Sequence, residues 1–283
     1  FIGKLLEELL AVAYKAHPYG ESGIGHMSDL ENLTRADAEE FFKKYYVPSN
    51  LIGVVVGDID SKRTCELAET YFGRLPRRPA PEDLRTVEPP QEAERRVTLR
   101  LQAQRLIVVG YHKPDINHPD NAVYDAISSL LSEGRSSRLY RSLVRDKKLA
   151  VAAGGFPGMP GNKYPGLFLF YAVTSPGHTN EECEQALGQE ITRLQSEEVT
   201  AAELDGVKRR ARAQLIRSLD DSAGLARELA SWQGLTGDWR NLFRQLERIN
   251  AVSPADVQRV ARTTFTPGNR TVGVVEPLAA GAK

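Results

Sequence analysis

The stretch TFTPGNRTVGVVEP, residues 264–277, closely repeats YYVPSNLIGVVVGDID, residues 45–60. In each stretch an aromatic residue is followed by a Pro two positions later and by an Asn two positions after that, and then by a Val-rich run. Because Pro disfavours helical backbone at the residue before it, each stretch predicts a helix end, a turn and then a strand. Two such similar stretches near opposite ends of one chain indicate an internal repeat.

The repeat continues upstream at a constant offset of 219 residues, without a gap. Thr34 and Ser253 are residue types that cap helix N-termini, and each is followed three positions later by an Asp, which predicts a capping box. Chance accounts poorly for the same residues at one fixed offset, so we interpret the pattern as a duplication. The equivalent pairs include Leu6 and Leu225, Leu10 and Leu229, Asp37 and Asp256, Tyr46 and Phe265, Pro48 and Pro267, Asn50 and Asn269, and Val55 and Val274.

The duplication predicts two domains, of which the first is incomplete. Residues 76–93 are rich in Pro and charge, as linkers are. We therefore assign residues 1–75 to the tail of a first domain and residues 94–283 to a second domain. If the second copy starts near residue 94, its counterpart would start about 125 residues before Phe1. The head of the first domain would then lie outside this sequence.

Hydrophobic periodicity predicts the elements of the second domain. Thr200 and Glu203 form a further predicted capping box, which opens a long helix. Strands and helices come in groups instead of alternating strictly, which predicts an α+β fold with helices packed on a mostly antiparallel sheet. The strands are expected at 95–103, 105–112, 149–156 and 166–174, and further helices at 118–134, 136–148, 179–195, 221–236 and 239–250.

Composition excludes several classes of function and site. Lys plus Arg and Asp plus Glu both number 37, so net charge predicts no nucleic-acid partner. No apolar run is long enough to span a membrane. The two cysteines, Cys65 and Cys183, are far apart, which favours structural thiols over a disulfide framework or a metal site. The five histidines lack helical metal-binding spacings, and we expect His17 and His118 in turns.

Several segments together resemble the pitrilysin/insulinase-type zinc metallopeptidases, a family that includes the mitochondrial processing peptidases. AHPYGESGIG, residues 16–25, and the stretch at 45–60 are similar to the second part of that family's first domain. GRSSRLYRSLVRDKKLAV, residues 134–151, and GDWRNLFRQLERINAVSPADVQRVARTTFTPGNRTVGVVEP, residues 237–277, are similar to its second domain. The order and spacing of these segments carry the resemblance over nearly the whole chain. It implies two similar α+β domains that face each other across a substrate chamber.

The resemblance implies that the zinc site lies outside this sequence. In the family an H-x-x-E-H motif and a further Glu of the first domain bind zinc, and the Glu within the motif is the general base. The family places both before the segment at 16–25. In the second domain DAISS, Asp125–Ser129, takes the place of the motif without its His or Glu. We therefore predict zinc in the intact parent protein, no metal bound by this chain, and no catalytic residue in it.

The resemblance also implies one substrate-binding residue. Many family members carry an Arg and a Tyr that contact the substrate, in a run similar to R-E-K-R-G-L-A-Y. Here the run is VRDKKLAV, residues 144–151: Arg145 is present, one residue is missing, and Val151 replaces the Tyr. Some bacterial members divide the zinc motif and the Arg/Tyr pair between partner chains. The resemblance therefore implies a zinc-bearing parent that has a homologous partner subunit or forms a homo-oligomer.

The leading interpretation is the C-terminal portion of a zinc-dependent endopeptidase that processes or degrades peptides, with this portion shaping the substrate chamber. The alternative is an inactive scaffold or partner subunit of a two-subunit peptidase of the same family. A third interpretation, an unrelated α+β binding domain, requires the duplication to be accidental. The incomplete first domain predicts that residues 1–75 pair with another chain or pack unusually. The compartment stays open, with a bacterial periplasmic or secreted location as one option.

Overall fold

The structure is a computed structural model and describes residues 1–278. By packing, the chain divides into two compact units. Among the described residues, the first unit comprises residues 1–22, 87–214 and 243–278, and the second unit comprises residues 23–86 and 215–242. The domains predicted from the duplication are defined by the internal repeat and not by packing, so their boundary stays a prediction.

The first unit is built on a five-stranded sheet with the strand order β1-β5-β2-β4-β3. Strands β1 and β5 are parallel, and the other three neighbouring pairs are antiparallel. The predicted α+β fold with a mostly antiparallel sheet is therefore confirmed. The strands span Arg95–Leu101 (β1), Leu106–Lys113 (β2), Ala150–Met159 (β3), Gly166–Thr174 (β4) and Arg270–Pro277 (β5).

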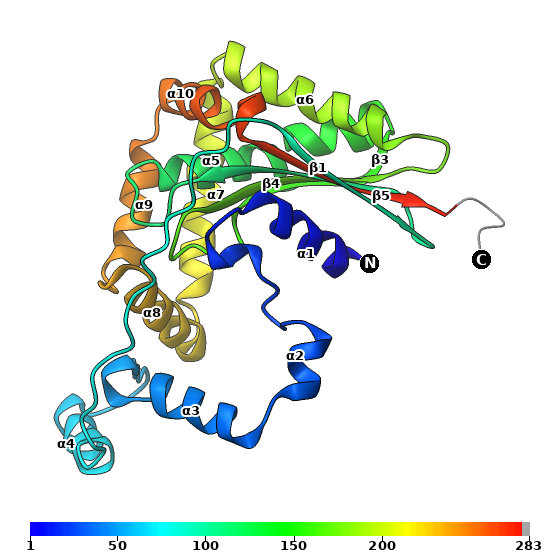
Figure 1. The fold of residues 1–283 in the computed structure, drawn as a ribbon. Helices are drawn as coiled ribbons and strands as arrows, with labels where there is room; N and C mark the ends of the chain where they lie inside the picture. Colours follow the sequence, from blue (N-terminus) through cyan, green and yellow to red (C-terminus); the bar gives the residue numbers. More distant parts are fainter. Residues whose placement is uncertain (279–283) are drawn as a thin grey trace. The chain divides into compact units, whose positions relative to one another are not determined.

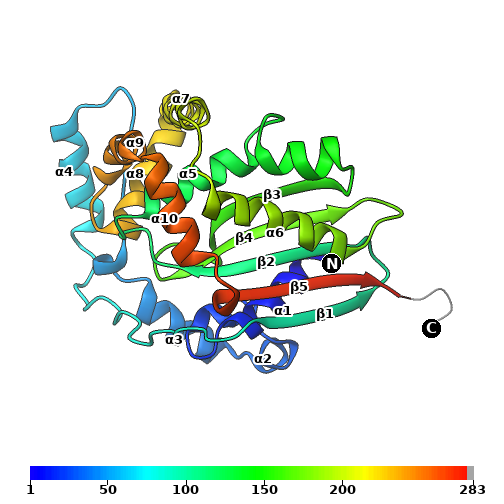
Figure 2. The same ribbon diagram turned by 90° about the horizontal axis from the view of Figure 1, so that it is seen from above.

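Helices α5 (Asn121–Ser132), α6 (Asn180–Ser196) and α10 (Pro254–Thr264) cover one face of this sheet (Figure 2). Alternate residues of β2, Ile107 and Val109, point to this face and are buried in the larger core. Each large apolar side chain buried in this way contributes about 1.5–3 kcal/mol. This core holds the three helices in place on the sheet.

Helix α1 (Ile2–Ala13) covers the opposite face of the same sheet (Figure 1). Leu5 and Leu9 are fully buried there. Both pack over Gly273 of β5, where an added Cβ would lie 3.1 Å from the Cδ1 atom of each leucine. Val108 of β2 joins this second core, because successive strand residues point to opposite faces. A helix from the predicted tail of the first domain therefore packs on the sheet of the predicted second domain.

The other α-helices lie in the second unit or cross its boundaries. Helices α7 and α9 each contain a boundary between the two units. No helix in residues 1–278 combines the length and the apolar character that a membrane span needs. Their bounds are Met27–Asn32 (α2), Arg35–Tyr45 (α3), Ser61–Phe72 (α4), Ala201–Ser218 (α7), Ser222–Thr236 (α8) and Asn241–Ala251 (α9). The chain also forms 3-10 turns at Pro18–Gly20, Pro48–Asn50 and Pro267–Asn269 and a π-helix at Tyr140–Asp146.

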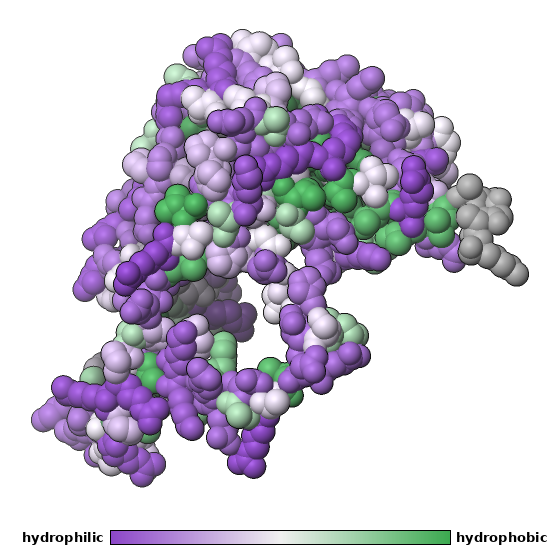
Figure 3. Space-filling model, in the orientation of Figure 1, coloured by the Kyte–Doolittle hydropathy of each residue, from purple (hydrophilic) through white to green (hydrophobic). Residues whose placement is uncertain are grey.

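The strand predicted after Asn50 is wrong. Residues 51–56 are not part of any strand, whereas their counterparts in β5 pair with neighbours on both sides. A strand is held by hydrogen bonds to a neighbouring strand, and residues 23–86 and 215–242 contain none. The second unit also exposes large apolar residues along α3 and α4, which Figure 3 shows as scattered green side chains on a mostly hydrophilic face. Those more than half exposed are Phe41, Phe42, the α3 C-cap Tyr46, Tyr71 and Phe72.

The duplicated stretch nevertheless keeps its local geometry in both copies. Both helices open with the predicted capping box, at Thr34 and Ser253, and both lead into a 3-10 turn on the shared Pro-x-Asn. In each turn the Asn side-chain amide donates to the carbonyl five residues earlier, at 3.0 Å for Asn50 and 2.8 Å for Asn269. The same cap, turn and side-chain bond at one offset support the duplication.

Candidate functional site

The segment that the family resemblance aligns with the zinc motif, Asp125–Ser129, lies on α5. Burial of the Asp125 carboxyl group raises its pKa to about 6, against the opposing effect of the Lys113 ammonium. Burial in turn lowers the pKa of Lys113. Oδ2 of Asp125 accepts hydrogen bonds from Gln245 Nε2 at 2.5 Å and from Asn121 Nδ2 at 3.3 Å. The first motif position is therefore part of an enclosed polar cluster.

The other two motif positions hold serines that tie α5 to its neighbours. Ser128 Oγ donates to the carbonyl oxygen of Gly155 in β3 at 2.9 Å. Ser129 Oγ donates to Glu133 Oε2 at 2.6 Å and accepts from Arg210 Nε of α7 at 3.1 Å. Zinc sites use His, Cys and carboxylate ligands, so these hydroxyl groups do not fit the ion. The described part of the chain holds no group of three or more such side chains placed to bind a metal.

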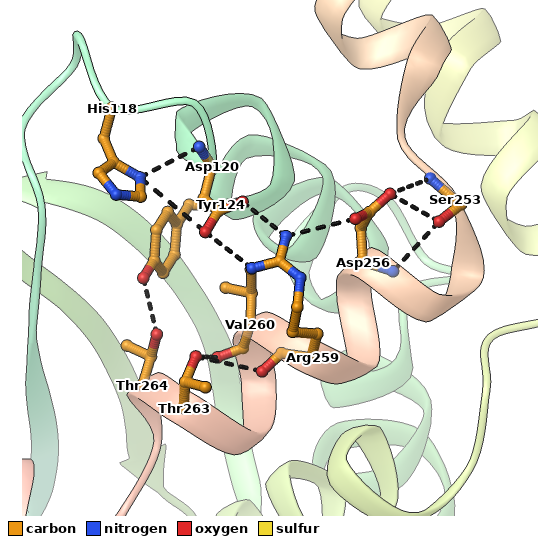
Figure 4. Close-up of polar contacts among 9 residues, drawn as sticks. All are labelled: His118, Asp120, Tyr124, Ser253, Asp256, Arg259, Val260, Thr263 and Thr264. Atoms are coloured by element: carbon orange, nitrogen blue, oxygen red, sulfur yellow. Dashed lines mark hydrogen bonds and ion pairs between the residues drawn. The ribbon is translucent and has the colours of Figure 1, made fainter.

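Helix α5 is also fixed to α10 by a polar network (Figure 4). Arg259 forms a bidentate ion pair with Asp120, with N–O distances of 2.7 and 2.9 Å, which lowers the pKa of Asp120. Arg259 also reaches Asp256 of the capping box at 3.3 Å. Deeper in the core, the hydroxyl oxygens of Tyr124 and Thr264 lie 2.6 Å apart, and both residues are buried. The helix at the motif position is thus joined to the duplicated helix by structural bonds.

Three of the histidines have structural roles. His17 Nδ1 accepts the backbone N–H of Tyr19 at 3.0 Å, and His118 Nδ1 accepts that of Asp120 at 3.1 Å. The turn positions predicted for both are confirmed. His112 Nε2 lies 3.0 Å from a carbonyl oxygen at the end of α1, and burial lowers its pKa.

Arg145, the predicted substrate-binding residue, lies near the end of the π-helix Tyr140–Asp146. Its guanidinium pairs with the neighbouring Asp146 at N–O distances of 2.6 and 3.1 Å, which raises the pKa of Arg145. The side chain is 56% exposed, so it is accessible from solvent. Its role in substrate binding stays a prediction.

The predicted linker contributes a structural residue, Glu88, that no motif marks. Its carboxylate accepts the backbone N–H of Lys15 at 2.7 Å and those of Ala16 and His17 at 2.9 Å each. Burial would raise the pKa of Glu88, but the three N–H groups outweigh it and lower the pKa. Glu88 therefore holds the chain directly after α1. Its partners lie more than 70 residues away, so local sequence carries no signal for this contact.

A second contact without a sequence signal joins the π-helix segment to α7. Arg138 is 6% exposed and donates through Nε and Nη2 to both carboxylate oxygens of Glu203, at 2.8 and 2.9 Å. Glu203 also accepts the backbone N–H of Thr200 at 2.9 Å, as the predicted capping box requires. The bond from Arg138 is the main cause that lowers the pKa of Glu203 to about 2.

Residues 32–211 match the family described as "Peptidase M16 inactive domain". The chain belongs to the peptidase M16 family. The zinc protease PqqE of Helicobacter pylori is 32% identical to this M16 chain over 98% of the chain and 62% of that protein. The probable mitochondrial-processing peptidase subunit beta of Schizosaccharomyces pombe is 28% identical over 91% of the chain and 58% of that protein. The M16 chain thus spans about three fifths of the length of these relatives.

Solved structures confirm the M16 fold. A protease from Helicobacter pylori matches with a TM-score of 0.91 at 30% identity, over 98% of this chain and 67% of that one. The inactive peptidase domain of a putative zinc protease from Bordetella parapertussis matches with a TM-score of 0.57 at 29% identity, over 65% of this chain and 97% of that one. The family resemblance and the fold class predicted from the sequence are both confirmed, and this M16 chain carries the family's inactive domain.

Proposed function

We propose that this chain is the C-terminal portion of a zinc-dependent endopeptidase, in which it forms the non-catalytic part of the substrate chamber. Residues 1–75 would be the tail of a first, catalytic domain, residues 76–93 the linker, and residues 94–283 the second domain. The proposal rests on how the two copies of the duplicated helix differ in burial.

On α10 the apolar face of this helix is covered by helices α5 and α6 together with strand β2. Val260 is 1% exposed and Ala261 is fully buried. Their counterparts on α3 are Phe41 and Phe42, which are 57% and 58% exposed. Helix α3 thus has the apolar side chains that a helix packs on a sheet, and no strand lies in the second unit to cover them. A sheet with covering helices, equivalent to those around α10 in the first unit, would cover this face.

The turn after each helix supports the same conclusion. Asn269 donates to its own helix and also to the carbonyl oxygen of His112 in β2, at 2.9 Å. Asn50 makes the equivalent bond to its helix, but the second unit has no strand in the place of β2. Residues 51–56 lack a partner strand for the same reason. One sheet, supplied by further polypeptide of the first domain, would satisfy all three features.

Zinc and the catalytic base would belong to that further polypeptide. The resemblance places the H-x-x-E-H motif there. At the equivalent position here Ser128 and Ser129 offer no zinc ligand, and Asp125 alone does not make a zinc site. Relatives that are named zinc proteases support zinc in the parent protein. This chain would then enclose the substrate, and Arg145 would bind a peptide held in extended form.

The alternative is a scaffold subunit without peptidase activity. One observation favours it: the ubiquinol-cytochrome-c reductase complex core protein I of Euglena gracilis is 25% identical over 95% of this chain. That relative is named for its complex and not for a peptidase activity. The presence or absence of H-x-x-E-H in the parent protein separates the two functions, because the motif is needed for zinc-dependent cleavage.

Complementation tests the proposal. The chain is purified alone and together with the polypeptide that precedes it in the parent protein, and cleavage of a fluorogenic peptide library is measured. We expect cleavage only from the combination, and loss of cleavage when Gln replaces the motif's Glu. Arg145→Met in the combination should raise KM about tenfold, while the matched control Arg100→Met, on an exposed residue of β1, should leave it unchanged. A combination that assembles but cleaves nothing would favour the scaffold.

A further inference from the structure

A small cavity of about 180 Å³ lies in the first unit, where the π-helix Tyr140–Asp146 meets α6 and α7. A buried water needs only about 10–15 Å³ by the same measure, so the cavity has room for a small organic molecule. Its lining is almost wholly charged. The cations include Arg138 and Lys147, and the anions include Glu190 of α6 and Glu203 of α7.

Two residues of this lining, of opposite charge, each carry a buried atom that has no hydrogen-bond partner among residues 1–278. The atoms are Nη1 of Arg138 and Oε2 of Glu190, on residues that are 6% and 9% exposed. Glu203 holds the Arg138 guanidinium by its other two nitrogens, so the free nitrogen is fixed in place. The Arg193 nitrogen that pairs with Glu190 Oε2 is 4.0 Å away, which is beyond hydrogen-bond length. Buried polar atoms of this kind are rare because leaving them unpaired is unfavourable.

The backbone beside the cavity is unusual as well. π-Helices are rare and occur frequently at functional sites. The segment that follows contains Lys148 at φ 55°, a left-handed conformation that residues other than Gly seldom adopt. Irregular backbone of this sort clusters at sites that bind ligands. The unpaired side-chain atoms and the irregular backbone are independent observations, and Arg138, which carries one of those atoms, lies just before the irregular segment.

The charges of the cavity lining indicate which kind of ligand fits. A simple anion would pair with Arg138 but would be repelled by the unpaired carboxylate of Glu190. A simple cation would pair with Glu190 but would be repelled by the Arg138 guanidinium. We propose that the cavity binds a small zwitterion of amino-acid size, whose carboxylate accepts from Arg138 Nη1 and whose ammonium donates to Glu190 Oε2. Arg141 and Lys147, which also line the cavity, would favour entry of the carboxylate end. The proposal is independent of any activity of the parent protein, because the whole site lies in the first unit.

Binding of L-leucine to the full chain tests the proposal, with N-acetyl-L-leucine, L-leucinamide and inorganic phosphate as comparison probes. The first analogue lacks the ammonium and the second lacks the carboxylate. Isothermal titration and NMR shift mapping should give leucine a Kd below about 10 mM, and each analogue should bind at least tenfold more weakly. The shifted resonances should lie in the π-helix segment and in α6.

Glu190→Gln is the preferred variant, because substituting Arg138 would also break its pair with Glu203 and disturb the fold. We expect Glu190→Gln to weaken the binding of leucine at least tenfold and to leave the binding of N-acetyl-L-leucine unchanged. The matched control on the same helix, the exposed Glu181→Gln, should change neither. Three results would overturn the proposal: no binding of leucine, binding of phosphate in its place, or leucine binding that Glu190→Gln does not alter.

Discussion

Replacing the side chain at one position of the duplicated helix by Ala should lower the free energy of unfolding unequally in the two copies. Val260 is 1% exposed, and its counterpart Phe41 is 57% exposed. Val260→Ala removes two buried carbon groups at about 0.8 kcal/mol each and leaves a cavity, so we expect a loss of about 2–3 kcal/mol. Phe41→Ala removes a larger side chain that lies mostly in solvent, and we expect a loss of about 1 kcal/mol or less. The smaller residue should therefore matter more.

Urea unfolding with two probes distinguishes the two losses. Both tryptophans, Trp232 and Trp239, lie in the second unit, so their fluorescence reports the unit that contains Phe41. Circular dichroism reports both units, including the core of the first unit in which Val260 is buried. If Phe41→Ala costs as much as Val260→Ala, the face of α3 is covered in this chain and the argument from unequal burial is refuted. In the presence of the further first-domain polypeptide, the cost of Phe41→Ala should rise to about 3–5 kcal/mol.

Three further predictions concern single contacts in the first unit. Burial raises the pKa of Asp125 to about 6, so its contribution to stability is fully present below the unfolded pKa near 4 and is lost as pH rises through 6. Between pH 4 and pH 8 the stability of Asp125→Asn relative to the unsubstituted chain should therefore increase by up to about 3 kcal/mol, measured by urea unfolding at each pH; a difference independent of pH would contradict this. Glu88→Gln should cost about 1–3 kcal/mol, because a neutral amide replaces a carboxylate that accepts three backbone N–H groups. Amide exchange after α1 should accelerate in that variant, and unchanged exchange would count against the contact. Tyr124→Phe leaves the buried hydroxyl of Thr264 without its partner and should lower the thermal midpoint by an amount that corresponds to about 1–3 kcal/mol, whereas an unchanged midpoint would show that the bond contributes nothing.

Local structure was predictable where a few neighbouring residues determine it. The capping boxes at Thr34, Ser253 and Thr200 follow from side chains that bond within one helical turn. The sheet's mostly antiparallel character followed from the grouping of strands and helices. The fixed offset between the copies at Pro48 and Pro267 was visible because it is a property of the sequence alone.

Contacts between distant segments were not predictable in the same way. The apolar pattern of α1 indicated a helix, but it did not indicate that Leu5 and Leu9 would pack over Gly273. The strand predicted after Asn50 failed because a strand needs a neighbour, and local pattern does not reveal whether one is available. The contacts of Glu88 and the unpaired nitrogen of Arg138 depend on partners far along the chain, which no local motif encodes.

Zinc stoichiometry tests the central claim most directly. The claim is that this chain carries the inactive M16 domain and that the metal-binding residues lie in further polypeptide of the parent protein. Metal analysis after dialysis against zinc should give less than about 0.1 zinc per molecule for this chain and about one zinc per molecule for the parent protein that carries H-x-x-E-H. One tightly bound zinc in this chain alone would contradict the account.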